Sequence, residues 1–94
     1  MTTEIKMKVT NLESNKGNTV ANQFEIIGEN GRYFQSYKSM IAFIPNDGGK
    51  TQLDAHYWDY SQTTGKYRNQ FLGEDKKATE AKIKSGEYIL TNLN

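Results

Sequence analysis

The sequence contains no cysteine, and its 94 residues include one proline, one histidine and one tryptophan. Without cysteine there is no disulfide framework, zinc–thiolate site or cysteine nucleophile. No run of 18 apolar residues occurs, so we expect no membrane-spanning helix. The first nine residues also lack the apolar stretch of a secretory signal. These absences favour a soluble protein.

The numbers of positively and negatively charged residues are nearly equal, with 12 Lys and Arg against 11 Asp and Glu. The net charge of +1 excludes a strongly acidic DNA mimic and a strongly basic histone-like protein. The hydrophobic fraction is only 35%, and six tyrosines supply much of it. A chain of this length and composition predicts a single domain, residues 1–94, with a thin core.

The first part of the chain shows the two-residue periodicity of strands. Residues 4–9 alternate strictly, which predicts a half-buried strand with Ile5, Met7 and Val9 on its covered side. Residues 11–18 are polar and predict a loop, and residues 20–27 return to strand character.

A hairpin signal follows at Asn30-Gly31. This dipeptide is typical of a two-residue turn with positive φ at both positions. The turn would pair three sets of residues across the strands: Glu29 with Arg32, Ile27 with Phe34, and Phe24 with Tyr37.

Residues 40–44 form a continuous apolar run, which predicts a central strand covered on both faces. The segment 45–49 contains proline and two glycines and breaks this strand, so residues 50–53 are expected to form the returning strand. Residues 54–60 are rich in aromatic side chains and have no clear periodicity.

Helical periodicity begins near Ser61. Tyr60, Thr64, Tyr67 and Phe71 fall on one helical face. Ser61 or Thr63 is expected to cap the helix, and Gly73 to end it. A second helix is expected to start at Glu74-Asp75 and to end before Gly86, and residues 88–90 predict a last short strand. The fold class is therefore α+β: a mostly antiparallel sheet of about five to six strands, with two short helices from the C-terminal half packed on one face.

Two local patterns carry little chemistry. His56 lies between Asp54 and Asp59, but a metal site usually needs three protein ligands and no further histidine exists to complete one. Gly48-Gly49-Lys50-Thr51 ends like a phosphate-binding loop, but the first glycine of that motif is replaced by Ile44. We predict no metal, no cofactor and no enzymatic activity.

Residues 57–68 (YWDYSQTTGKYR) are the densest candidate for function. Hydroxyl groups and cations at the start of a helix suit phosphate, and aromatic side chains among cations are typical of single-stranded nucleic-acid binders. In the alternative interpretation the aromatic residues fix the helix to the sheet and the hydroxyl groups only cap it. The candidate binding residues are Tyr57, Trp58, Tyr60, Ser61, Thr63, Thr64, Lys66 and Arg68.

Residues 36–42 (SYKSMIA), Gly49-Lys50, residues 57–67 (YWDYSQTTGKY), residues 71–73 (FLG) and residues 82–88 (KIKSGEY) resemble a shared pattern. The pattern is that of a family of small proteins from phages and plasmids of Gram-positive bacteria, roughly SYxTxIA, GK, YWDYSxTTxKY and FLG. The resemblance covers about residues 33–94, with Ser39 where members often have Thr. It implies a mobile-element origin and the cytoplasm of a bacterial host.

Two functions follow as expectations. The first is a non-enzymatic protein that binds nucleic acid, or a nucleic-acid–protein complex, through residues 57–68. The alternative is an anti-defence inhibitor, of the anti-CRISPR type, that binds a host nuclease; exposed Tyr, Trp and Arg suit protein interfaces equally well. The oligomeric state stays open, and a dimer is one of the options.

Overall fold

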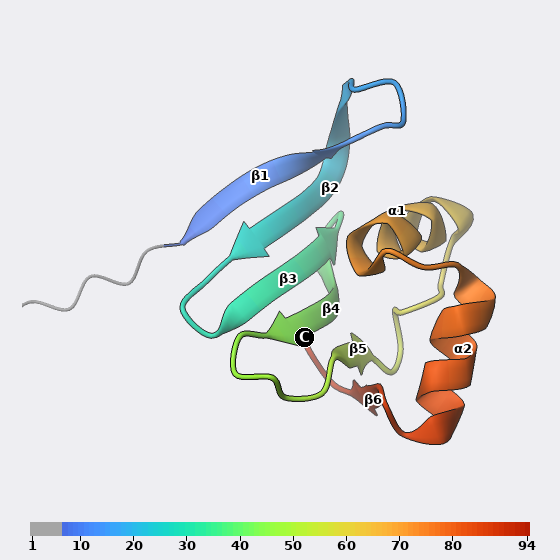
Figure 1. Cartoon of the computed structure of the whole chain (residues 1–94). Coiled ribbons are helices and arrows are strands. Elements are labelled where there is room, and N and C mark those ends of the chain that lie inside the picture. Colours follow the sequence, from blue (N-terminus) through green and yellow to red (C-terminus); the bar gives the residue numbers. More distant parts are fainter. Residues whose placement is uncertain (1–6) are drawn as a thin grey trace, which may run out of the picture.

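The structure is a computed structural model that describes residues 7–94. Within this range six strands form one sheet and two helices lie in the C-terminal half, which confirms the predicted α+β class (Figure 1). The elements are β1 (Lys8–Glu13), β2 (Thr19–Ile27), β3 (Gly31–Ser36), β4 (Ser39–Pro45), β5 (Gln52–Asp54), α1 (Gln62–Leu72), α2 (Lys76–Ser85) and β6 (Ile89–Thr91).

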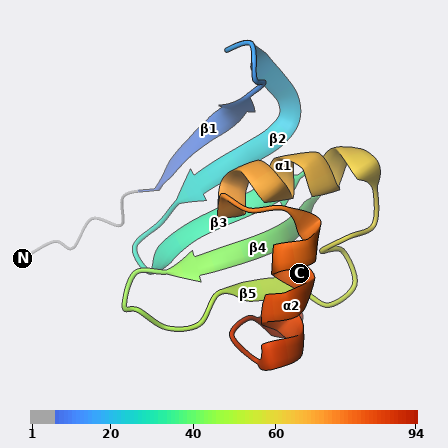
Figure 2. The ribbon, with the colours of Figure 1, turned by 45° about the vertical axis from the view of Figure 1, so that its right-hand side comes forward.

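The strands follow one another in the sheet in sequence order, and each neighbouring pair is antiparallel except β5 and β6. Those two strands are parallel, and the chain between them contains both helices. Two parallel strands need a crossover connection of this kind. Both helices lie over the same face of the sheet (Figure 2). In the described part of the chain, neither helix is long and apolar enough to span a membrane.

The core lies between this face and the helices. Phe34 is fully buried and its ring stacks on that of Phe71 from α1, with centroids 5.8 Å apart. A buried hydrogen bond of 2.8 Å joins the hydroxyl groups of Ser36 in β3 and Thr64 in α1. The other buried core residues are Ile41, Ala42, Leu53, Tyr67 and Tyr88.

Both helices begin and end where the sequence predicts. The Ser61 hydroxyl accepts a hydrogen bond from the Thr64 N–H at the start of α1, and Gly73 ends that helix in the left-handed conformation. Asp75 caps α2 in the same way and Gly86 ends it. The caps satisfy backbone groups that a helix leaves unpaired at its ends.

The partly buried carboxylate of Glu74, which lies just before α2, joins that helix to Tyr88, the residue before β6. Glu74 accepts hydrogen bonds from Lys82 Nζ at 2.6 Å, from the Tyr88 hydroxyl at 2.8 Å and from the Thr79 hydroxyl at 2.6 Å. Burial acts to raise the pKa of Glu74, but these hydrogen bonds prevail and lower it. Burial and the bond to Glu74 raise the pKa of Tyr88.

The predicted register of the β2–β3 hairpin is wrong by two residues. Ile27 pairs with Arg32 and Phe24 pairs with Gln35. Three residues, 28–30, join the strands, and the Gly28 N–H donates to the Gly31 carbonyl oxygen at 2.9 Å. Arg32 forms its ion pair with Glu25 at 3.1 Å instead of Glu29. Gly31 serves a different purpose from the predicted one, because a Cβ there would lie 2.2 Å from the Ile44 carbonyl oxygen of the neighbouring strand.

The first strand also differs from the prediction. Residues 4–6 lie outside the described residues, and β1 continues to Glu13 through part of the predicted loop. Met7 and Val9 are 64% and 60% exposed, because the face they share carries no helix in the described chain. For the same reason β4 is not covered on both faces as predicted: Ile41 and Ala42 are buried, whereas Phe43 is only partly buried.

Candidate functional site

The sequence left residues 54–60 unassigned. Residues 55–60 form a turn that joins β5 to α1, and Asp54, the last residue of β5, organises it. Asp54 is 1% exposed, and its Oδ2 accepts hydrogen bonds from the N–H groups of His56 and Tyr57 at 3.0 and 2.9 Å. Its Oδ1 accepts another from the Leu93 N–H at 2.8 Å. Burial acts to raise the pKa of Asp54, but the hydrogen bonds from Leu93, Tyr57 and His56 prevail and lower it. A structural carboxylate therefore sets the path of the chain before α1.

Arg68 binds this turn from the helix side. Its side chain is 1% exposed, and its Nη1 donates to the Trp58 carbonyl oxygen at 2.8 Å and to Asp59 Oδ1 at 3.2 Å. Its Nη2 donates to Asn69 Oδ1 at 2.9 Å. The guanidinium also lies over the Trp58 ring, 5.2 Å from the centroid. These contacts give Arg68 a positioning role and hold its charge inside the protein.

Asp59 connects the two helices. It contacts Arg68 of α1 and, through Oδ2, Lys76 Nζ at the start of α2 at 2.7 Å. Burial acts to raise the pKa of Asp59, but the hydrogen bonds from Lys76 and Arg68 prevail and lower it. The same contact raises the pKa of Lys76.

The hydroxyl groups at the start of α1 are largely engaged. Ser61 caps the helix, and fully buried Thr64 bonds to Ser36. Thr63 alone of these three candidate hydroxyl residues has an exposed side chain. The predicted phosphate site therefore keeps one exposed hydroxyl group of three.

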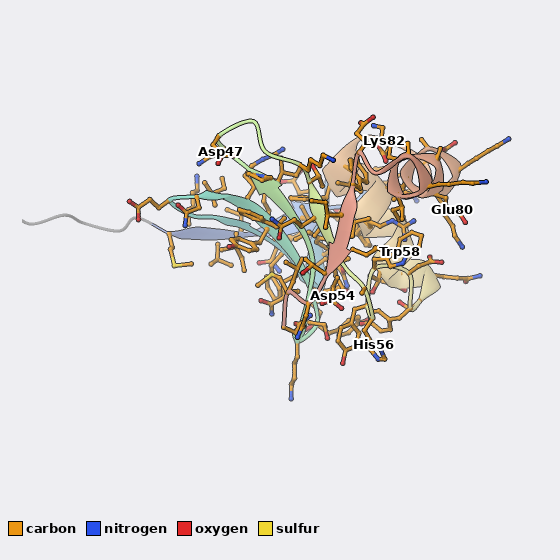
Figure 3. The ribbon with its side chains drawn as sticks, turned by 90° about the horizontal axis from the view of Figure 1, so that it is seen from below. Asp47, Asp54, His56, Trp58, Glu80 and Lys82 are labelled. Atoms are coloured by element: carbon orange, nitrogen blue, oxygen red, sulfur yellow. The ribbon has the colours of Figure 1, made fainter. Side chains whose placement is uncertain are left out.

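An exposed surface remains beside these buried groups. Tyr60 is 46% exposed, and its ring meets that of Tyr57 edge to face at 5.5 Å. The Tyr57 ring also meets the ring of exposed His56 edge to face, with the two ring centroids 4.5 Å apart. Figure 3 shows His56 at the periphery of the turn, beyond Asp54. This cluster presents aromatic edges to solvent.

A shallow hollow of about 560 Å³ lies next to Tyr60 at the start of α1. Lys66 is exposed there, and its ammonium group lies 5.3 Å from the centroid of the Tyr67 ring. Lys76 reaches the same hollow from α2. We call this hollow the α1 hollow; its lining residues are Asp59, Tyr60, Ser61, Gln62, Gly65, Lys66, Arg68, Asn69 and Lys76.

The structure thus divides the eight candidate residues by accessibility. Tyr60, Thr63 and Lys66 are exposed; Tyr57, Trp58 and Ser61 are partly buried; Thr64 and Arg68 are buried. Sequence reasoning missed the anchoring role of Asp54 and the arrival of Lys76 from α2. Asp54 had a signal, since an acidic residue at a strand end often bonds to the N–H groups two residues on. Lys76 had none, because its contact depends on how the helices pack.

Among residues 7–94, no group of three or more His, Cys, Asp or Glu side chains is arranged to hold a metal ion. His56 contacts Tyr57, and its backbone N–H bonds to Asp54.

The model of a family of unknown function, DUF8033, matches residues 7–88. The chain belongs to this family. The matched region contains strands β1 to β5, both helices and every residue of the α1 hollow; β6 lies outside it. No curated protein and no solved structure matches the chain significantly.

Proposed function

We propose that this member of the DUF8033 family is a non-enzymatic binding protein that contacts single-stranded nucleic acid, free or within a nucleoprotein complex, at the α1 hollow. The observation that carries the proposal is the placement of exposed Tyr60 beside a hollow reached by Lys66 and Lys76. An accessible ring can stack on a base of any sequence while cations meet the phosphates. The resemblance to phage and plasmid proteins adds the proposal that it acts in the cytoplasm of a bacterial host.

The buried cation limits the strength of this binding. Asp59 is paired with both Arg68 and Lys76 and offsets one of the three positive charges that line the hollow, so a net charge of +2 is left there. Two neutralised phosphates predict a slope of log K against log salt of roughly −1.4 for a single strand. Stacking on Tyr60 must then provide much of the affinity, about 1–3 kcal/mol per base.

The proposal can be tested by a fluorescence anisotropy titration with a labelled single-stranded oligonucleotide. The titration starts at about 50 mM salt, because even a few phosphate contacts give detectable binding at low salt. Lys66→Ala should weaken binding and reduce the salt slope by about 0.7. Tyr60→Ala should weaken binding and leave the slope unchanged, because stacking releases no counterions. Lys50→Ala is the control: it removes the same charge from a residue that lines a different hollow and lies outside the α1 hollow, and it should change neither quantity.

The alternative, inhibition of a host nuclease by protein contact, gives a different result. No anisotropy change at high micromolar protein and low salt would remove direct nucleic-acid binding. If Tyr60→Ala and Lys66→Ala then abolish co-purification with a host protein, the same surface serves a protein partner.

A further inference from the structure

One row of side chains crosses the whole sheet on the face that carries no helix in the described chain. Strand pairing places its members opposite one another in turn: Val9, Ile26, Tyr33, Phe43, Gln52 and Ile89. We call the sheet face defined by this row the open face. The Tyr33 and Phe43 rings stack with centroids 4.4 Å apart. Phe43, Gln52 and Ile89 line one hollow, which confirms that they project from the same side.

The open face is an apolar surface separate from the core. Ile26 is only 9% exposed, yet of the buried apolar residues described it alone lies outside the core cluster beneath the helices. The two ends of the row are the most accessible, with Val9 60% and Ile89 42% exposed. Both described helices cover the other face (Figure 2), so nothing in residues 7–94 covers this one.

The distribution of charge across the sheet is the reverse of what a solvated face needs. An antiparallel sheet with one free face normally directs polar side chains to that face. Here neither the row nor the adjoining positions Asn11, Phe24 and Gln35 include a charged residue. Glu29, Asp47 and Lys50 lie at the margin of the row, where they line the same hollow as Phe43 and Ile89. Lys8, Glu25 and Arg32 occupy the alternate positions, on the helix side. This pattern is typical of a sheet face that is covered.

We propose that a second copy of this chain covers the open face, packing sheet against sheet about a two-fold axis. A two-fold interface packs the same surface of both copies together. A charged side chain near the axis would therefore face the identical charge of the partner, unless an oppositely charged side chain lay beside it. An uncharged row meets itself without repulsion. A different partner would usually be selected and steered by charge, which the row itself lacks. Two sheets with apolar inner faces pack about 10 Å apart, as in a sandwich.

The small size of the open face indicates that such a dimer is weak. With strands about 4.8 Å apart and a rise of about 3.4 Å per residue, roughly five residues on each of β1 to β4 and about three on each of β5 and β6 give a projected area of roughly 400 Å². This is within the range of the largest apolar patch on a typical monomer and about half of what each partner buries in a standard interface. The dimer should therefore be reversible, forming at roughly 10–500 µM rather than being obligate.

Sedimentation velocity across this concentration range tests the proposal, and adjacent residues of β6 supply a matched pair of variants. Ile89 and Leu90 are both 42% exposed, but Ile89 belongs to the open face and Leu90 pairs with core residue Leu53. Ile89→Lys should raise the dimer dissociation constant at least about tenfold, because two-fold symmetry brings two ammonium groups into one interface. Leu90→Lys should leave that constant within about twofold. Thermal unfolding at low concentration checks that both variants fold.

Val9→Lys, at the other end of the row, should weaken the dimer as Ile89→Lys does. A wild type that stays monomeric up to about 500 µM, the upper end of the expected range, would overturn the proposal. An equal loss of dimer in Ile89→Lys and Leu90→Lys would also overturn it. So would a dimer that Ile89→Lys leaves intact, since pairing through the edge strand β1 alone would behave in that way.

Discussion

Arg68 lies over the ring of Trp58, 5.2 Å from its centroid, and donates a hydrogen bond of 2.8 Å to the backbone carbonyl oxygen of the same residue. The pair joins the middle of α1 to the turn that precedes it. Because Arg68 also contacts Asp59, which binds Lys76 of α2, one guanidinium helps to place the turn and both helices. The geometry of the α1 hollow depends on this group.

Removal of Arg68 should therefore destabilise the whole domain. Arg68→Ala deletes hydrogen bonds to Trp58, Asp59 and Asn69 and opens a cavity at a site that is 1% exposed. We expect a loss of about 2–4 kcal/mol in the free energy of unfolding. Urea denaturation followed by circular dichroism measures it. Lys66→Ala, two residues away and exposed, is the control and should change stability by less than about 0.5 kcal/mol. Equal stability of the two variants would contradict the positioning role.

Stability should also fall in acid. The pKa values of Asp54 and Glu74 are lowered from their usual 3.8 and 4.5, so the folded protein binds fewer protons than the unfolded chain in this range. Their contribution is complete above about pH 5 and is lost as the pH falls through the folded pKa values. Asp54→Asn should cost about 1–3 kcal/mol at neutral pH and flatten the acid limb. An acid limb with the same slope in variant and wild type would show that Asp54 does not contribute.

Gly31 should tolerate no side chain, for a reason of packing. A Cβ at this position would lie 2.2 Å from the Ile44 carbonyl oxygen and 2.7 Å from the Phe43 ring. Gly31→Ala is expected to cost at least about 1–3 kcal/mol as β3 and β4 are forced apart. Gly28→Ala, in the connection between β2 and β3, is the control, since the nearest atom would be 3.8 Å away. Thermal melts that coincide for the two variants would disprove the close approach.

The parts of the fold that depend on local chemistry could be predicted from the sequence. Ser61 and Gly73 bound α1, and Asp75 and Gly86 bound α2, because caps act within one turn of backbone. The hairpin register could not be predicted in this way. Asn30-Gly31 favours a tight turn locally, but the pairing of Gly31 against Pro45 in β4 sets where β3 lies. That contact is between strands and leaves no local signal.

The candidate site shows the same division. The sequence singled out residues 57–68 as a concentration of aromatic, hydroxyl and basic side chains, yet it did not separate Lys66, which is exposed, from Arg68, which is buried. Burial of Arg68 follows from the turn that Asp54 holds and from Lys76 arriving through α2. These are tertiary relationships, and the residue types alone do not encode them.

The location of ligand binding is the most direct test of the proposed function. A ¹⁵N-edited NMR titration of the whole chain with a single-stranded oligonucleotide at low salt reports on every backbone N–H. We expect the shifts to concentrate at Tyr60, Gln62, Thr63, Gly65 and Lys66 around the α1 hollow. The open-face residues Val9 and Ile89 should not shift at constant protein concentration. Shifts confined to the open face, or none at saturating oligonucleotide, would contradict the assignment of the α1 hollow as the binding site.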